Sequence, residues 1–250
     1  MVDRISVVIL TKNSHKYLKK CLDALIEFKE IVILDNGSSD DTIEIAKSYP
    51  NTRITQHKFI GFGPLKNLAV KYASFDWILS IDSDEIVTPE LIEAIGNLDL
   101  TDFRNIYAVS RKNYYNGRLV KCCGWYPDIV NRLFNRNYTS FSNSMVHESL
   151  VIHPDTKKCL LNGAVLHYPF DNVESLINKM QSYSSLYARE NKKSLSPAKA
   201  FWHGFFAFFK NYIIQKGIFC GYEGLLISVS NANGVFYKYM KLYEKQVKGS

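Results

Sequence analysis

The chain has 250 residues, 46% of them hydrophobic, and a formal net charge of +7, so it can bury a full core as one large domain or as one domain with an appendage. No stretch approaches the roughly 18 to 20 uninterrupted apolar residues of a membrane-spanning helix, and the first residues show no apolar secretory segment. The five cysteines are odd in number and include no C-x-x-C pair, so we expect reduced thiols in a cytoplasmic protein and no zinc site.

The first half of the chain alternates short apolar runs with amphipathic segments. The apolar runs are rich in β-branched residues and predict buried strands at 5–10, 30–34, 53–56 and 77–81. Apolar residues at helical spacing and N-cap residues predict helices at 14–28, after residues 38–40, at 65–73 and from Pro89 onward. This alternation predicts an α/β fold with a Rossmann-like, mostly parallel sheet in three layers.

After residue 97 the pattern changes. Short strands are expected at 106–109, 132–134 and 163–167, with a hairpin turn at Asn116-Gly117. From residue 171 the chain is predicted to be helical, at 173–187, 197–214, 223–230 and 235–247. We therefore expect an α/β domain over residues 1–170, with a mixed second part, and a helical C-terminal region over 171–250.

All of the excess positive charge lies in the C-terminal third. Positions 176–250 hold 11 Lys and Arg against 3 Asp and Glu, whereas positions 1–175 hold 20 against 21. In the same region, segment 201–212 is aromatic on nearly all sides. This composition suits a helix at an anionic membrane surface. Packing onto the α/β domain, or an oligomer contact, would explain the aromatics equally well.

An acidic stretch follows the strand predicted at 77–81. Asp82 and Asp84 are separated by one residue, and Glu85 comes next. Loops at the carboxyl ends of strands are where open sheets bind ligands, and two such carboxylates can turn toward one Mg²⁺ or Mn²⁺ ion. The plain alternative is an acidic, solvated turn ahead of a helix, whose N-terminus favours anions.

Three other polar loops follow strand-like runs: Thr11-Lys12-Asn13, Asp35-Asn36-Gly37 and the segment 61–67. In a parallel sheet these three loops and the acidic stretch at 82–85 would share one edge. Neither G-x-G-x-x-G after the first strand nor G-x-x-x-x-G-K-[ST] occurs, which argues against a dinucleotide-dependent dehydrogenase and a P-loop enzyme. A buried Asp35 would suit a donor N–H of a base or a sugar hydroxyl. Lys66 would suit the ring or the phosphate.

The ordered set of motifs resembles glycosyltransferase family 2, the inverting transferases of the GT-A fold. The matching segments are 6–13, 35–42 and 82–85. More narrowly, the chain is similar to the bacterial lipopolysaccharide-core β-1,4-glucosyltransferase branch, through Gly61-Phe62-Gly63-x-x-Lys66-Asn67-x-Ala69, Trp125-Tyr126-Pro127-Asp128, Arg132-Leu133-Phe134 and Val146-His147-Glu148.

The resemblance implies a role for each matching residue in the donor site. Thr11 lies where the family's first loop meets the nucleotide, and Asp35 matches the residue that binds the uracil N–H. Lys66 would border the base and ribose. Asp84 would be the direct ligand of Mg²⁺ or Mn²⁺, and Asp82 would face the ribose or metal-bound water. Asp35 as a helix cap and Lys66 as a solvated residue are the structural alternatives.

The resemblance also implies a general base. Inverting transfer is an in-line displacement, so a carboxylate must take the acceptor hydroxyl's proton on the face opposite the departing UDP, while the cation neutralises the diphosphate. Glu148 matches this base, with Asp128 in reserve, although a structural salt bridge would also explain Glu148. His147 and His167 could reach the metal or the phosphates, or could be structural.

Together these observations predict a metal-dependent transferase that moves a hexose, with glucose as the first candidate, from a UDP-sugar to a lipopolysaccharide-core or other lipid-linked glycan. It would act in the cytoplasm or on the inner face of the cytoplasmic membrane, held there through 197–247, without nucleic acid.

Two alternatives remain. A sugar-nucleotide nucleotidyltransferase would want a Gly-rich basic loop, which Thr11-Lys12-Asn13 does not supply. A nucleic-acid-binding protein using the tail would need neither Asp35 nor Asp84. The oligomeric state is not fixed.

Overall fold

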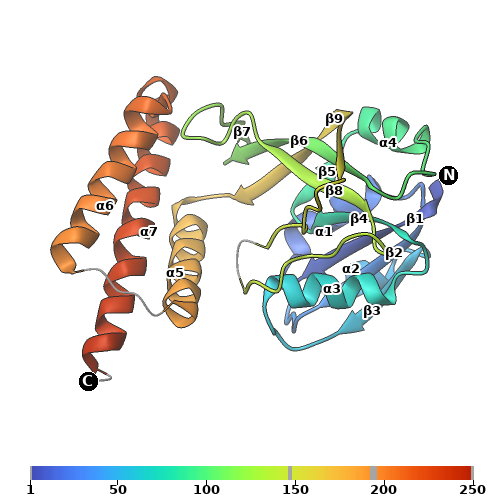
Figure 1. Ribbon diagram of the computed structural model, residues 1–250, viewed down its shortest axis with the longest axis horizontal. Coiled ribbons are helices and arrows are strands. Elements are labelled where there is room, and N and C mark those ends of the chain that lie inside the picture. The colour runs from blue at the N-terminus through green and yellow to red at the C-terminus, as the bar shows by residue number, and fades with distance from the viewer. Residues whose placement is uncertain (1, 146–147, 192–195, 249–250) are drawn as a thin grey trace. The chain divides into compact units, whose positions relative to one another are not determined.

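The computed structural model describes residues 2–145, 148–191 and 196–248 (Figure 1). The chain forms two compact units: the first is Met1–Arg111 with Ile129–His167, and the second is Lys112–Asp128 with Tyr168–Ser250. We call them the first and the second unit. The segment 112–128 lies with the C-terminal helices, which the sequence pattern did not suggest.

Four parallel strands form one half of the sheet in the first unit, in the order β3-β2-β1-β4: β1 Val2–Thr11, β2 Phe28–Asp35, β3 Thr52–Gln56 and β4 Trp77–Asp82. Their register aligns the carboxyl ends, because Thr11 pairs with Asp35 and Leu10 pairs with Asp82. The parallel arrangement predicted from the alternating pattern is therefore confirmed.

Helices cover both faces of these strands (Figure 1): α1 His15–Asp23, α2 Thr42–Lys47, α3 Phe62–Tyr72 and α4 Pro89–Gly96. Successive strand residues point to opposite faces. Ile9 and Ile33 accordingly share one core with residues of α1, α2 and α4, whereas Val8 and Val32 share another with α3. The predicted three layers are confirmed. Helix α1 is shorter than the expected 14–28, because the chain turns after Asp23 to bring the buried Phe28 into β2.

The other half of the sheet continues from β4 in the order β8-β6-β9-β5: β5 Glu85–Val87, β6 Asn105–Tyr115, β7 Arg118–Leu119, β8 Ile129–Asn135 and β9 Lys157–Phe170. Strand β8 is antiparallel to both β4 and β6, and β7 is antiparallel to β6, so the sheet as a whole is mixed, as expected. The hairpin turn is confirmed, since Asn116 and Gly117 both have positive φ, 46° and 75°. Strand β5 was not predicted. It lies antiparallel to β9, a partner that comes much later in the chain.

The second unit is mainly helical: α5 Val173–Glu190, α6 Pro197–Phe209, a π-helical turn Lys210–Ile214, a 3₁₀ turn Gly217–Cys220 and α7 Gly221–Lys248. Helix α7 packs against both α5 and α6, and Figure 1 shows it between them. The prediction of two helices at 223–230 and 235–247 was wrong. The helix continues through Gly234, which lies close to the Met180 side chain of α5, so packing outweighs the weak helix propensity of this segment.

The prediction of reduced thiols was also wrong for one pair. Cys122 and Cys220 form a disulfide within the second unit, beside Val120, Leu176 and Ile227. Among the described residues, the remaining cysteines are free thiols: Cys21, Cys123 and Cys159. No described helix combines the length and the apolar character that crossing a membrane requires.

Candidate functional site

The ends of β1 and β2 hold a buried threonine–aspartate pair. Thr11 Oγ1 donates to Asp35 Oδ1 at 3.0 Å, and both residues are almost fully buried. The second oxygen, Asp35 Oδ2, accepts from the backbone N–H groups of Gly37 and Ser38, each at 2.9 Å. Burial favours the neutral acid, but the hydrogen bonds from Ser38, Gly37 and Thr11 outweigh it and lower the pKa of Asp35.

The same edge contains a polar atom that has no partner. Among the described residues, the buried side-chain oxygen of Asn36 accepts no hydrogen bond. Such an acceptor normally needs a donor, because a buried unsatisfied polar group costs about 1 to 3 kcal/mol. The loops around it are joined to one another: Asn13 N–H donates to Ser38 Oγ at 2.8 Å, and the hydroxyls of Ser14 and Ser83 lie 2.8 Å apart.

Asp82, at the end of β4, lies between two cationic side chains. Lys66 Nζ lies 3.1 Å from Asp82 Oδ1, and Arg132 Nη2 donates to Asp82 Oδ2 at 2.8 Å. Burial tends to raise the pKa of Asp82, but Arg132 and Lys66 hold it well below its usual range. Asp82 is therefore a carboxylate with both oxygens occupied by protein cations.

Lys66 links this aspartate to the candidate base. Its ammonium nitrogen lies 2.7 Å from Glu148 Oε1 and 5.3 Å from the centre of the Phe141 ring. The Lys66 side chain is only 8% exposed and Glu148 only 16%. Burial favours the neutral amine, yet the charges of Asp82 and Glu148 raise the pKa of Lys66. The alternative of a solvated lysine on a helix face is excluded by this burial.

Arg132, on β8, is a buried cation that pairs with two carboxylates of the site, Asp82 and Glu85. Its Nη2 group also makes a very short contact with Glu85 Oε1, and Glu85 is fully buried. Glu85 in turn accepts from the Asp82 backbone N–H at 3.1 Å, and Arg111 Nη1 lies 3.6 Å away. Burial tends to lower the pKa of Arg132, but the charges of Asp82 and Glu85 outweigh this effect and raise the pKa above its usual value. Among the described residues, Arg132 Nε is buried without a hydrogen-bond partner.

The start of α3 is tied to the segment that leads to Glu148. The Phe62 and Gly63 N–H groups donate to the carbonyl oxygens of Met145 and Ser144, at 3.0 and 3.1 Å. Gly63 has no room for a side chain, because a Cβ there would lie 1.9 Å from the Ser142 carbonyl oxygen. The segment that carries the base candidate is thus held by the glycine-containing turn before Lys66.

Asn67, one residue beyond Lys66, strengthens this attachment. Its side-chain amide donates to the Phe141 carbonyl and accepts from the Phe141 N–H, both at 2.9 Å. Phe141 also pairs with Leu150 in an antiparallel bridge, which closes the loop that contains Glu148. The motif that contains Gly63, Lys66 and Asn67 is therefore explained by contacts: Gly63 and Asn67 hold the segment around Glu148, and Lys66 pairs with Glu148 itself.

Asp84 lies in the turn between β4 and β5, beside His167 of β9. His167 Nε2 is 3.6 Å from Asp84 Oδ2, and the two side chains are 12% and 29% exposed. Among the described residues, no group of three or more His, Cys, Asp or Glu side chains is placed to hold a metal. A carboxylate and an imidazole fit one divalent cation that takes its remaining ligands from water and a diphosphate. His147 lies outside the described residues.

Asp128, the reserve base candidate, belongs to the second unit. It accepts from the Asn113 side chain at 2.8 Å, and that amide also donates to the Trp125 carbonyl at 3.0 Å. These contacts lie within the segment 112–128, so Asp128 helps to hold the conformation of this segment. The first unit holds all the other candidate site residues.

Sequence reasoning missed the roles of Arg132 and Glu85. Both belong to the motifs that carry the family resemblance, but the motifs alone predict no function for either residue. The available signal was a charge next to an apolar strand: Arg132 directly precedes Leu133, which pairs with Leu79 of β4. That signal does not show which carboxylates the arginine faces. His167 was considered only as one of two histidines, and its pairing with Asp84 depends on β5 lying beside β9.

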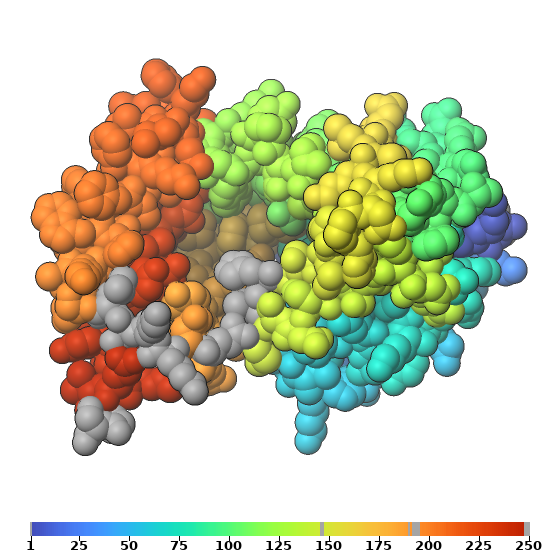
Figure 2. All heavy atoms as spheres, in the orientation of Figure 1, coloured from blue at the N-terminus to red at the C-terminus, as the bar shows by residue number. Residues whose placement is uncertain are grey.

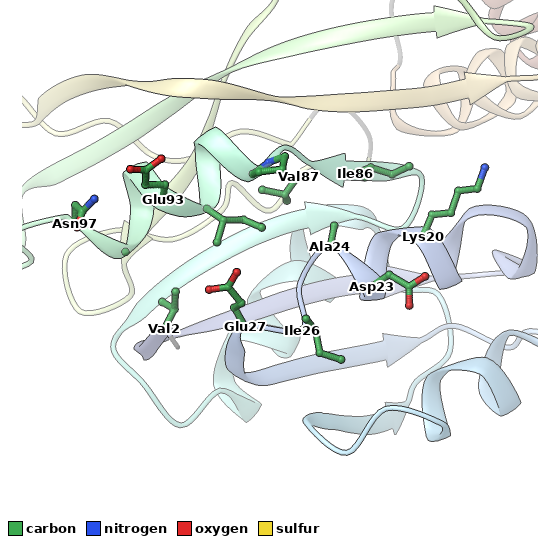
Figure 3. Close-up of a pocket in the computed structure, with 13 residues that line it drawn as sticks. Val2, Lys20, Asp23, Ala24, Ile26, Glu27, Ile86, Val87, Glu93 and Asn97 are labelled. Atoms are coloured by element: carbon green, nitrogen blue, oxygen red, sulfur yellow. The ribbon is translucent and has the colours of Figure 1, made fainter.

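A hollow of about 860 Å³ lies elsewhere in the first unit (Figure 3). Its walls come from β1, α1 with the turn after it, β5 and α4, and include Lys20, Asp23, Ile26, Glu27 and Glu93. None of the candidate site residues lines it. The strand-end cluster has the reactive groups and the buried charges, so we assign the site there and not to the hollow.

The chain is similar to known proteins over most of its length. A family model described as Glycosyl transferase family 2 matches residues 6–121. An uncharacterized glycosyltransferase of Rickettsia prowazekii (strain Madrid E) is 29% identical, with 98% of this chain and 88% of that protein covered. Lipopolysaccharide core biosynthesis glycosyltransferase LpsC of Rhizobium meliloti (strain 1021) is 27% identical, with 96% and 92% covered.

Solved structures are more distant. The crystal structure of S. aureus TarS 1–349 in complex with UDP has a TM-score of 0.48 and 16% sequence identity, and the comparison covers 99% of this chain and 92% of that one. A likeness of this degree carries no conclusion about ligands.

Proposed function

We propose that the chain is a member of glycosyltransferase family 2 and acts as a metal-dependent inverting transferase, which moves a hexose from a UDP-sugar to a lipid-linked glycan. Glucose is the first candidate for the sugar, and the cytoplasmic face of the membrane is the site of action. The observation that carries this proposal is the Lys66 bridge between Asp82 and Glu148, because it brings together the two carboxylates to which we assign the ribose side and the general base.

The donor base would be recognised at the ends of β1 and β2. Asp35 is an ionised acceptor held by Thr11 and by the turn at Gly37 and Ser38, and it suits the uracil N3–H. The unpartnered oxygen of Asn36 would accept a second donor from the nucleotide. A nucleoside that lacks such N–H groups would leave these buried acceptors unpaired, which is how a polar site selects its ligand.

The diphosphate would lie near Asp84 and His167. These two side chains would hold Mg²⁺ or Mn²⁺, which when bound neutralises the negative charge of the leaving diphosphate. Asp82 would act on the ribose side, with its charge already balanced by Lys66 and Arg132.

Glu148 would act as the general base. Its carboxylate takes the proton of the acceptor hydroxyl, whose oxygen attacks the anomeric carbon on the face opposite UDP. The bond from that carbon to the diphosphate oxygen breaks, and its electron pair leaves with UDP. Lys66, 2.7 Å from Glu148, fixes the position of this carboxylate through their ion pair.

The acceptor class is supported by the similarity to lipopolysaccharide core biosynthesis glycosyltransferase LpsC, which extends over nearly the whole of both chains. A lipid-linked saccharide is therefore our first candidate acceptor. A nucleotidyltransferase is less well supported, because the polar loop after β1 contains no glycine-rich basic segment.

The proposal is tested by thermal shift with UDP, GDP, CDP and ADP, each with and without Mn²⁺. We expect UDP with Mn²⁺ to stabilise the protein selectively, by about 2.7 kcal/mol at a hundredfold excess over Kd. Asp84→Ala should remove the manganese-dependent part and abolish UDP release from UDP-sugar and acceptor, with the fold intact. Asp41→Asn, an exposed change with no side-chain cap bond to lose, is the control. Equal stabilisation by all four nucleotides, or normal turnover of Asp84→Ala, would contradict the proposal.

A further inference from the structure

One face of α6 consists of exposed aromatic rings. Their exposed fractions range from 46% to 61%, at Phe201, Trp202, Phe205, Phe206 and Phe209. Positions i, i+1, i+4, i+5 and i+8 lie on one side of a helix, so the rings form a continuous strip, which we call the aromatic face of α6. Soluble monomers rarely expose a contiguous apolar patch of this kind without a partner for it.

The rings point away from α7 because small residues occupy the opposite side of α6. Ala200 and Gly204 are buried. A Cβ on Gly204 would lie 3.2 Å from the Ala232 carbonyl oxygen and 3.3 Å from Phe236 Cβ, both on α7. The close approach of the two helices thus uses the small residues and leaves the aromatic face free of α7. Figure 2 shows α6, in orange, at the surface.

Exposed apolar side chains continue after α6. Ile214 is 66% exposed, Ile218 is 48% exposed and Phe219 is 82% exposed. The first two turns after α6 therefore extend the apolar surface, rather than returning the chain to a core.

The charge of this segment has one sign. Between Ser196 and Tyr222 the sequence holds three lysines and no acidic residue, and all three lysines are exposed: Lys199, Lys210 and Lys216. The next acidic residue, Glu223, forms an ion pair with Arg118 at 3.2 Å.

The lysines further along the chain make contacts within the second unit. Lys241 Nζ lies within 2.8 to 3.1 Å of oxygen atoms of Gln181, Ser184 and Ser185 on α5. Lys238 lies over the rings of Tyr187 and Tyr239, 4.8 and 5.0 Å from their centres. Since these lysines already have partners within the second unit, we consider as a membrane contact only the first part of the expected range 197–247, which ends at Phe219.

We propose that the aromatic face of α6 and the turns up to Phe219 dock on an anionic lipid bilayer. The aromatic rings would enter the interface between head groups and acyl chains, and Lys199, Lys210 and Lys216 would lie at the lipid phosphates. Amphipathic helices with Trp and Phe on one side and lysines beside them bind membranes in this way, and each lysine near an anionic surface strengthens the attraction. The inference does not depend on the transfer reaction.

A second copy of the chain fits this surface less well. A two-fold contact would place the same surface patch against itself, so the three lysines would face lysines with no carboxylate in the segment to balance them. Single-stranded nucleic acid also fits less well, because three lysines spread between positions 199 and 216 are few for a phosphate backbone.

Vesicle co-sedimentation of the full chain tests the proposal. We expect the protein to bind vesicles of phosphatidylcholine with phosphatidylglycerol far more tightly than vesicles of phosphatidylcholine alone. Phe205→Ser with Phe206→Ser should weaken this binding at least about tenfold, from the lost apolar burial. Phe103→Ser is the matched control, because Phe103 is 55% exposed but lies in the first unit, and it should leave binding unchanged.

A charge variant separates the two parts of the surface. Lys199→Gln with Lys210→Gln and Lys216→Gln should weaken binding to the anionic vesicles by about fivefold per lysine and remove most of its salt dependence. Circular dichroism should show native helix content in both variants, since every altered side chain is exposed. Should the double phenylalanine variant misfold, Trp202→Ser carries the same test.

Three outcomes would overturn the proposal. The first is no binding to anionic vesicles, and the second is binding that the aromatic variant leaves intact. The third is a dimer in solution, or a complex with single-stranded RNA, that the aromatic variant abolishes while vesicle binding persists. UDP binding to the wild-type protein is measured separately. If UDP binds but the vesicles do not, the membrane inference is contradicted and the proposed transfer reaction is not.

Discussion

The two units depart from the usual distribution of polar and apolar residues in opposite directions. The first unit buries charged side chains, since Lys66, Glu85 and Arg132 are at most 8% exposed. The second unit exposes rings that could have formed a core, such as Phe206 at 61% and Phe219 at 82%. Charged residues are almost never fully buried unless paired, and large exposed apolar patches are unusual. Both departures coincide with the places for which we propose a ligand or a partner.

The two departures differ in what they cost the isolated protein. Lys66, Glu85 and Arg132 each have an opposite charge within 3.6 Å, so the penalty of desolvating them is largely offset as long as every member is present. The exposed rings of the second unit carry no charge, so they involve no desolvation penalty of this kind. We therefore expect substitutions of these buried charges to affect folding and catalysis together, and substitutions of the exposed rings in the second unit to affect association alone.

The largest effect is expected from Lys66→Met. This change leaves Asp82 and Glu148 without their shared cation, and losing one partner of a buried ion pair costs about 3 to 5 kcal/mol. Transfer should fall at least about a hundredfold, because the base candidate loses its position. Urea unfolding and UDP release measure the two losses. Lys71→Met, an exposed change on the same helix, should alter neither; an equally stable, active Lys66 variant would show that the buried charges are incidental.

This network also shows how far the sequence alone can lead. The parallel half of the sheet was predictable, because its apolar runs are local and its strands follow one another in register. Asp35, Asp82 and Asp84 could be placed at strand ends for the same reason. The partners of these residues were not predictable: Arg132 lies far from Asp82 in the chain and reaches it only because β8 is inserted next to β4. Packing likewise overrode local propensity in α7, which continues where the sequence suggested a break.

Glu148→Gln separates catalysis from binding within the first unit. The amide keeps the size of the carboxylate and can still accept a hydrogen bond from Lys66, but it cannot take a proton. General bases contribute about 10² to 10⁴ in rate, so kcat should fall within that range while UDP affinity changes little. Asp128→Asn is the comparison, and we expect it to retain activity. The reverse pattern would assign the base to Asp128.

Gly63→Ala tests whether the start of α3 positions the base. The added Cβ would meet the Ser142 carbonyl oxygen at 1.9 Å, so the segment before Glu148 must move, at a cost of about 1 to 3 kcal/mol. Transfer should fall about tenfold through kcat, with UDP affinity preserved, because the residues that we propose to bind the base, Asp35 and Asn36, lie at the end of β2 and not in the segment before Glu148. Gly96→Ala, at a helix end with open space around it, is the control. A loss of UDP affinity equal to the loss of rate would mean that the loop serves the nucleotide instead.

The smallest effect concerns Asp35 and pH. Its pKa is lowered in the folded protein by hydrogen bonds that outweigh burial, so its ionised form stabilises the fold at neutral pH. That stabilisation is lost as the pH falls below the ordinary aspartate value of 3.8 and through the lower folded-state pKa. Asp35→Asn should cost about 1 kcal/mol at pH 7 and flatten the decline in stability under acid, as measured by urea unfolding between pH 2 and 7. UDP affinity should fall in the same variant, whereas Asp41→Asn keeps both; an Asp35 variant with weaker folding but unchanged UDP binding would reduce this residue to a structural brace for the turn at Gly37.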